Sequence, residues 1–252
     1  MTDKEQLWPG GPVLYQAEHF RLGTDCVLLA DFARTTGARR GIDLGCASGA
    51  AMLLLLSRTE TLRMTGLEIV PEAAELARRN LAENGLETRG EIVTGDIRDH
   101  RALFRAGSFD LVIANPPYYP AGNGALPADA DRAAARSELK SSLEEICRAA
   151  AYLLRTGGRA CLVHKPERLA ELFCRLAENG LEPKRLRLVC RRPESAPSLV
   201  LVEARRGGKP GLTIEPPLLL QGPDGGESEE LARVYRQRKK DKKTEKAENR
   251  FQ

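Results

Sequence analysis

Short apolar runs alternate with amphipathic stretches from residue 39 to about residue 163, and this alternation constrains the fold more than any other feature of the sequence. It is the pattern of repeated strand–helix–strand units, which build a parallel sheet covered by helices on both faces. Two further strand-like segments flank the turn-forming stretch RPESAP. We therefore expect an α/β fold whose seven-stranded, mostly parallel sheet ends in a C-terminal antiparallel hairpin. The predicted strands cover residues 39–45, 62–69, 90–96, 109–115, 159–164, 183–191 and 198–207.

The 252 residues suffice for one large core, and the remaining segments are short. The strand–helix pattern predicts a single domain over residues 39–206. Residues 1–38 are a predicted N-terminal extension whose short helix packs beside the ligand site. Residues 207–236 are a predicted C-terminal extension packed on the domain. Residues 237–252 are a basic tail, expected to be disordered because most of its side chains are charged.

The composition argues against secreted, membrane and zinc proteins. Six cysteines are scattered without a C-x-x-C pair, which is typical of reduced thiols in the cytoplasm. No apolar signal region and no long apolar run is present, so we expect a soluble cytoplasmic protein without a membrane partner or a bound metal. The net charge of +4 comes largely from the tail, which is either a solvated end or an arm that attracts nucleic-acid phosphate.

The turn after the first predicted strand reads DLGCASG, residues 43–49, and its glycines allow a ligand to approach the backbone closely. We call it the cofactor turn. A nicotinamide fingerprint would need glycine at positions 45, 47 and 50, whereas this chain has Ala47 and Ala50. The turn therefore argues against a dehydrogenase.

Acidic residues follow the next two strands. Glu68 is either an acceptor for two ribose hydroxyls or a solvated strand-end acid. Asp96, followed by Ile97, either brackets an adenine or caps a helix. Because open α/β sheets bind ligands at the carboxyl ends of their strands, we expect these residues and the cofactor turn to line one cleft.

The fourth strand ends in Asn115-Pro-Pro-Tyr118, which we call the clamp. Two prolines offer no backbone N–H and stop the sheet ladder rigidly. An amide, an exposed carbonyl and an aromatic ring are thereby held in nearly fixed relation. The alternative is a simple Pro-Pro turn with packed tyrosines.

Together, these strand-end features resemble the class I S-adenosylmethionine (SAM) methyltransferases over residues 39–206. The resemblance implies a Rossmann-like fold and SAM as the cofactor. The clamp resembles the signature of enzymes that methylate a nitrogen conjugated to a π-system, either an exocyclic base amine or a glutamine amide. The implied catalytic residues are Asn115, Pro116, Pro117 and Tyr118.

A conjugated nitrogen is a poor nucleophile because its lone pair is delocalised. Two acceptors that hold its hydrogens favour a more pyramidal nitrogen, and the Asn115 side-chain oxygen and the Pro116 carbonyl are suited to this role. Tyr118 is suited to stack on the planar target. The sulfonium of SAM supplies the electrophile, so the protein positions the reactants and needs no metal.

Further segments resemble one family of this class, the bacterial tRNA adenine-N6 methyltransferases that act beside the anticodon of valine tRNA. These segments are YQAEHFRLGTDCVLLADF (15–32), DRAAARSEL after a predicted loop (119–136), PPLLL (216–220) and ELARVYR (230–236). The resemblance implies tRNA as the substrate, bound by Tyr118, Arg132 and Arg136, although the two arginines are equally well explained as solvated charges. The implied SAM-binding residues are Thr24, Asp25, Asp43, Gly45, Gly49, Glu68, Ile69, Asp96, Ile97 and Asn115.

The chain departs from that family at Ala47, where the family has glycine. The added Cβ is tolerated if the φ angle stays negative. Two other functions remain open. One is a protein glutamine N5-methyltransferase with the same clamp, which usually carries a docking domain before the sheet. The other is a catalytically silent RNA-binding protein with this fold, which Ala47 permits.

Overall fold

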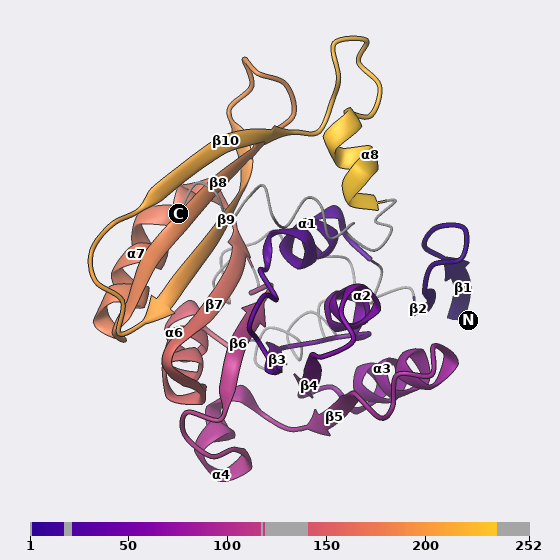
Figure 1. Cartoon of the computed structure of the whole chain (residues 1–252), viewed down its shortest axis with the longest axis vertical. Helices are drawn as coiled ribbons and strands as arrows, with labels where there is room; N and C mark the ends of the chain where they lie inside the picture. The colour runs from indigo at the N-terminus through magenta and orange to yellow at the C-terminus, as the bar shows by residue number, and fades with distance from the viewer. Residues whose placement is uncertain (1, 18–21, 117, 119–140, 236–252) are drawn as a thin grey trace, which may run out of the picture.

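The computed structural model describes residues 2–17, 22–116, 118 and 141–235 of the chain. An eight-stranded sheet runs through this described part, with helices on both faces (Figure 1). Its strands are β3 (Arg40–Leu44), β4 (Arg63–Glu68), β5 (Gly90–Thr94), β6 (Phe109–Ala114), β7 (Leu154–His164), β8 (Leu181–Cys190), β9 (Pro197–Arg206) and β10 (Thr213–Leu219).

The strand order is β10-β8-β9-β7-β6-β3-β4-β5. Strands β3 to β7 form a parallel block. Strand β9 lies antiparallel between β7 and β8, and β10 pairs in parallel with β8. The carboxyl ends of β8 and β10 therefore lie at the same edge of the sheet as those of β3 to β7.

Helices cover the two faces of the sheet in separate apolar layers. One layer contains α1 (Thr24–Phe32), α2 (Ala50–Arg58), α3 (Pro71–Glu83) and α8 (Glu229–Tyr235). The other contains α6 (Leu143–Leu153) and α7 (Leu169–Glu178). Short helical turns follow β5 and β7, namely η1 (Ile97–Asp99), α4 (His100–Leu103) and η2 (Pro166–Arg168). None of the helices in the described ranges is long and apolar enough to cross a membrane.

The spacing of apolar residues explains how these helices dock. In α6, Leu143, Ile146, Ala150 and Leu153 recur at intervals of three or four residues and are all buried against the sheet. A capping box at Ser142 starts this helix, because the Ser142 hydroxyl accepts from the backbone N–H of Glu145 while the Glu145 side chain accepts in return.

All seven predicted strands form, but the predicted count is wrong because β10 adds an eighth. Two prolines, Pro216 and Pro217, make this segment unlike a strand in the sequence. The structure accommodates them at the edge of the sheet, where the pairing register with β8 shifts between Glu215 and Leu218. Proline is tolerated there because an edge strand leaves part of its backbone unpaired.

A separate hairpin of β1 (Thr2–Gln6) and β2 (Val13–Ala17) docks on α3 through two asparagines. Asn80 and Asn84 lie one helical turn apart, so both face the same way. The Asn80 side chain bonds both backbone groups of Tyr15, and Asn84 does the same for Val13. Asn80 also donates to the carbonyl of Ser48 over 2.9 Å, which ties this hairpin to the cofactor turn.

Candidate active site

The predicted ligand-binding segments lie at one edge of the sheet. The cofactor turn, Glu68, Asp96 and the clamp follow β3, β4, β5 and β6, and these four strands run in parallel. Their carboxyl ends therefore face the same side of the molecule, which is where open α/β sheets bind ligands. This common edge is the candidate active site.

The cofactor turn is left-handed at two glycines. Gly45 and Gly49 have φ angles of 78° and 76°. Gly45 is exposed, and a Cβ there would meet no atom within 4 Å, so this part of the turn leaves room for a ligand. Gly49 begins α2, and a Cβ at Gly49 would lie only 3.1 Å from the Cβ of Ala77. The second glycine thus lets α2 and α3 pack closely.

Ala47 does not meet the condition of a negative φ angle under which its added Cβ is expected to be tolerated. Its φ is +47°, and Ala47 is the one described non-glycine residue with a positive φ. A left-handed conformation costs an L-amino acid roughly 1–2 kcal/mol. The Ala47 N–H donates to Oε2 of Glu68 over 2.8 Å, and this bond helps to hold the strained turn.

Two buried carboxyl groups, Asp43 and Glu68, lie at the base of the cofactor turn, with 3% and 7% of their surfaces exposed. Glu68 accepts one backbone N–H on each oxygen, from Ala47 and from Val70, and both oxygens keep a free lone pair. The Asp43 carboxyl has no hydrogen-bond partner in the described part of the chain. Burial, and secondly the neighbouring Glu68, raise the pKa of Asp43 to about 8. A cationic ligand beside Asp43 would favour its charged form.

Asp96 has the geometry of a helix cap. It accepts from the backbone N–H of Arg98 over 2.8 Å and pairs with the Arg98 guanidinium. These hydrogen bonds lower the pKa of Asp96. Ile97 is 9% exposed and packs in the apolar layer beneath, and Ile69 is half-buried after β4. Cofactor contacts of these three residues remain predictions.

Asp25, in the first turn of α1, ties the clamp together. Its Oδ2 accepts from the Asn115 amide nitrogen over 3.0 Å and from the Tyr118 hydroxyl over 2.5 Å. Burial, and secondly the bond to Asp25, raise the pKa of Tyr118, so the phenol stays protonated and donates. The structure places the Asp25 carboxylate against the clamp, and the cofactor contact that the resemblance implied for Asp25 remains a prediction.

The Asp25 bridge fixes the orientation of the Asn115 amide. Because the amide NH2 group faces Asp25, the amide oxygen is left as an acceptor. Within the ranges that the structure describes, no donor bonds either this oxygen or the backbone carbonyl of Pro116. The clamp therefore offers two neighbouring acceptors for the hydrogens of an amino group.

Residues at the end of β7 and just after it, for which the sequence predicted no role, contact Tyr118. The His164 ring meets the Tyr118 ring edge-on, with centroids 5.7 Å apart. The Lys165 ammonium lies 5.2 Å from the centre of the Tyr118 ring, and Arg168 donates to the Tyr118 carbonyl over 3.3 Å. The signal was available in the sequence, because β7 is the fifth parallel strand and its carboxyl end lies at the same edge.

The His164 ring is neutral and buried. Its Nδ1 accepts from the backbone N–H of Lys165 over 2.8 Å, so Nε2 carries the hydrogen. Nε2 is buried and has no hydrogen-bond partner among the described residues. Burial, and secondly the charge of Arg168, lower the pKa of His164 to about 4. The ring beside Tyr118 is therefore uncharged at neutral pH.

Of the remaining predicted site residues, the structure describes Thr24 but not Pro117, Arg132 or Arg136. Thr24 is exposed, and its hydroxyl shares a hydrogen bond of 3.1 Å with that of Tyr235 on α8. Pro117, Arg132 and Arg136 lie outside the described residues, so their roles remain predictions. A search of the described ranges finds no group of three or more His, Cys, Asp or Glu side chains placed to hold a metal ion.

The family profile and the curated proteins that match this chain are all methyltransferases. The profile of the methyltransferase small domain family matches residues 12–177. A curated tRNA1(Val) (adenine(37)-N6)-methyltransferase of Porphyromonas gingivalis strain W83 is 35% identical over 191 residues, which cover 73% of this chain and 74% of that protein. A protein of the same name from Tolumonas auensis is 31% identical over 212 residues, covering 84% of this chain and 86% of its own length.

Two solved methyltransferases have folds similar to that of this chain. A predicted O-methyltransferase from Agrobacterium tumefaciens superimposes with a TM-score of 0.68 at 24% identity, covering 84% of this chain and 95% of that one. A geranyl diphosphate methyltransferase in complex with SAM gives a TM-score of 0.54 at 18% identity, covering 72% and 84% of the two chains. These similarities show the fold. The profile match and the sequence relatives show that the chain belongs to the methyltransferase small domain family.

Proposed function

We propose that this protein is a SAM-dependent methyltransferase that places a methyl group on the N6 amine of an adenine in tRNA, adenine 37 of tRNA1(Val) as in its named relatives. The observation that carries the proposal is the bridged clamp, in which Asp25 bonds Asn115 and Tyr118 and leaves two acceptors for an amino group. A tRNA substrate also implies a cytoplasmic enzyme.

Asp43, Gly45 and Glu68 fit SAM, whereas Ala47 adds a Cβ at a positive φ angle. The ligand is a sulfonium cation, and Asp43 is a buried carboxyl group that lacks a hydrogen-bond partner in the described part of the chain. Glu68 retains a lone pair on each oxygen for ribose hydroxyls, and the space beside Gly45 is open. When bound, SAM supplies an electrophilic methyl group, so the chain itself needs no strong base.

The clamp performs the positioning. The Asn115 amide oxygen and the Pro116 carbonyl accept the two hydrogens of the target amine. This favours a pyramidal nitrogen whose lone pair is less conjugated with the base ring. Tyr118 stacks on the base, a contact worth roughly 1–3 kcal/mol. Asp25 keeps the amide from turning its NH2 group toward the target. These contacts raise the rate by holding the amine in a reactive geometry.

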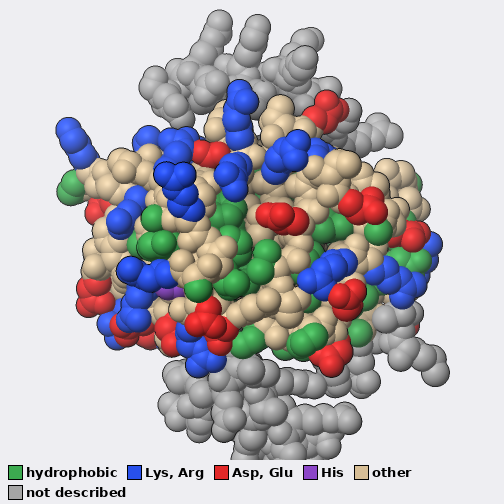
Figure 2. Space-filling model, turned by 90° about the horizontal axis from the view of Figure 1, so that it is seen from below, with side chains coloured by type: hydrophobic (Ala, Val, Ile, Leu, Met, Phe, Trp, Pro, Cys, Tyr) green, Lys and Arg blue, Asp and Glu red, His purple; other side chains and the backbone are tan. Residues whose placement is uncertain are grey.

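The basic side chains on the face shown in Figure 2 do not form a continuous patch. On the face shown in Figure 2, Lys and Arg are interspersed with Asp and Glu around hydrophobic side chains. Attraction to phosphate over this face is therefore weak, because opposite charges cancel at distances beyond about 10 Å in salt. This face therefore does not supply a general attraction for RNA, and recognition of the target depends on contacts near the clamp.

Transfer of a tritium-labelled methyl group from SAM tests the proposal. The acceptors are unmodified tRNA1(Val), a tRNA1(Val) transcript with adenine 37 replaced by guanine, and a release-factor protein. Label in the first alone is expected. Label in the release factor alone would support the glutamine N5-methyltransferase instead. SAM binding without label in any acceptor would support the catalytically silent alternative.

A further inference from the structure

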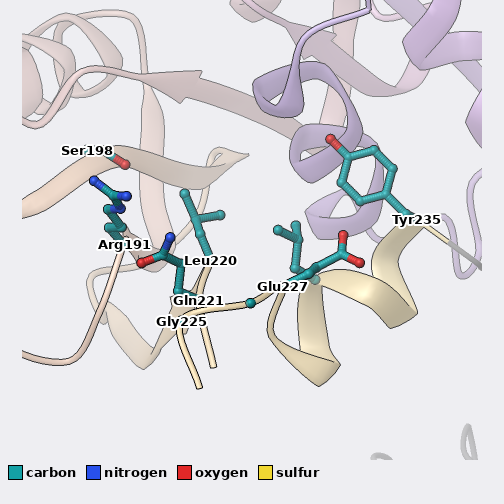
Figure 3. A pocket seen from close by; sticks show the side chains of 9 residues that line it. Arg191, Ser198, Leu220, Gln221, Gly225, Glu227 and Tyr235 are labelled. Carbon is teal, nitrogen blue, oxygen red and sulfur yellow. The ribbon is translucent and has the colours of Figure 1, made fainter. Parts of the chain in front are cut away.

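A solvent-open hollow of about 550 Å³ lies between the β8–β9 turn, the end of β10 and α8 (Figure 3). Arg191 and Ser198 line one side, and Glu227 and Tyr235 line the other. Its volume is within the range of roughly 300–1,000 Å³ that is usual for sites of small ligands. Because β8 and β10 end at the same edge as the parallel block, the hollow opens on the active-site side of the sheet.

Two chains of contacts place the hollow beside Tyr118. At one side, Tyr235 bonds Thr24, and the next residue, Asp25, bonds the Tyr118 hydroxyl. At the other side, the Ser198 carbonyl accepts from the Lys165 ammonium over 3.4 Å, and this ammonium lies 5.2 Å from the centre of the Tyr118 ring. The lining of the hollow is therefore linked to Tyr118 of the clamp from two sides.

The hollow has an apolar base and two uncommitted charges. Leu220 and Leu231 supply the apolar surface. Arg191 and Glu227 are exposed, lie on opposite sides of Leu220 in Figure 3, and have no side-chain partner in the described ranges.

Nearby arginines differ from Arg191 in this respect. Arg187 pairs with Glu230 over 2.6 Å, and Arg192 donates to the Gln221 side chain over 3.0 Å. These two guanidinium groups hold β8 to α8 and to the segment after β10. Arg191 has no such structural task, so its charge is available for a ligand.

We propose that the hollow receives the base of the unpaired nucleotide next to the target adenine, a proposal that rests on the proposed function. A base that enters the clamp must leave its stack, and its neighbour then loses a stacking partner. The two leucines give this neighbour an apolar surface. Glu227 accepts a hydrogen bond from its exocyclic amine, and Arg191 donates to the adjoining phosphate. A base with an exocyclic amine is therefore preferred over uracil.

An anticodon stem-loop RNA and two versions with an abasic residue, on the 5′ or the 3′ side of the target, provide the test. The removal of one of the two neighbouring bases is expected to raise the KM of the wild-type protein about tenfold, with kcat nearly unchanged. The substitutions Glu227→Gln and Arg191→Ala are each expected to raise the KM for intact RNA about fivefold. In these variants the abasic residue should raise the KM only slightly further, because the substitution and the missing base disrupt the same contact.

Matched controls carry the same charge changes at the opposite edge of the sheet. The control substitutions are Glu87→Gln and Arg105→Ala. Glu87 precedes β5, Arg105 precedes β6, and both side chains are exposed. Both control variants are expected to keep the wild-type KM. SAM affinity, measured by calorimetry, is expected to be equal in all five proteins, because the hollow lies outside the cofactor turn.

The two proposals fail in different ways. If the wild-type protein methylates none of the RNAs, the proposed function is overturned and the base-binding hollow with it. If the wild-type protein methylates the intact RNA but Glu227→Gln and Arg191→Ala keep its KM, the hollow alone is overturned. The same conclusion follows if both variants retain the full abasic effect.

Discussion

The two sides of the active site are held in place by different kinds of contact. On the cofactor side, Glu68 and the cofactor turn are joined by backbone N–H groups only a few residues from adjacent strand ends. On the clamp side, Asn115 and Tyr118 are joined by Asp25, which lies 90 residues before Asn115. The cofactor side is therefore built by the sheet itself, whereas the clamp depends on how α1 docks. Changes in the clamp should leave cofactor binding intact.

Asn115→Ala should have the largest effect. It removes one of the two acceptors for the target amine, and we expect kcat to fall by 10²–10³-fold, roughly 2–4 kcal/mol in the barrier. SAM affinity, measured by calorimetry, should be unchanged, because Asn115 belongs to the clamp side. A loss of SAM affinity as large as the loss in kcat would assign Asn115 to the cofactor side. The two sides of the active site would then not be independent.

Asp25→Ala should have the next largest effect. It releases the Asn115 amide and the Tyr118 phenol together, and we expect kcat to fall by about 10–100-fold, which is the cost of roughly one or two hydrogen bonds to a charged group. Tyr118→Phe keeps the stacking ring and loses one of these bonds, so its kcat should fall by about fivefold.

A double variant separates positioning from direct contact for Asp25. If Asp25 acts through the amide, Asp25→Ala should reduce kcat much less in an Asn115→Ala background than in the wild type. Asp25→Asn retains an acceptor oxygen and should recover part of the activity. If the two substitutions reduce kcat by independent factors in the double variant, Asp25 acts on the reactants by another route.

Local signals in the sequence located both the cofactor turn and the clamp, but they did not reveal the contact that joins the residues of the clamp. A glycine turn and a strand-end acid can be read from a few neighbouring residues, and the structure brings the cofactor turn and Glu68 to one edge. The link between Asp25 and Asn115 spans 90 positions and depends on the docking of α1, which no local pattern encodes.

The errors of the sequence analysis also have local causes. Strand β10 was not expected because Pro216 and Pro217 resemble a strand break, and only its place at the sheet edge makes them acceptable. The positive φ angle of Ala47 arises from the surrounding turn, since alanine itself disfavours this conformation. His164 was within reach of prediction, because the rule applied to the other parallel strands also applies to β7.

The pH dependence of SAM binding tests the cofactor side. The pKa of Asp43 is raised to about 8 in the ligand-free protein by burial and by Glu68. If the SAM cation binds beside the charged form of Asp43, SAM affinity should fall as the pH drops below about 8, by up to tenfold per pH unit, about 1.4 kcal/mol. Calorimetry between about pH 6 and pH 9 measures this slope.

Asp43→Asn is the control for this slope. It cannot ionise, so its SAM affinity should vary less with pH and should be lower than that of the wild type at about pH 9. Any slope common to both proteins belongs to other groups, including the amine of SAM. Identical slopes in the two proteins would show that Asp43 does not interact with the cation.

Ala47→Gly should have the smallest effect and the opposite sign. Glycine adopts the positive φ of this position without strain, so the free energy of unfolding should rise by about 0.5–1 kcal/mol after the entropy cost of glycine is subtracted. Ala82→Gly, at an exposed position in α3, should lower it by about 1 kcal/mol. Urea unfolding measures both. If Ala47→Gly also destabilises the protein, the turn is not strained at Ala47, and the cofactor side gains stability from the methyl group itself.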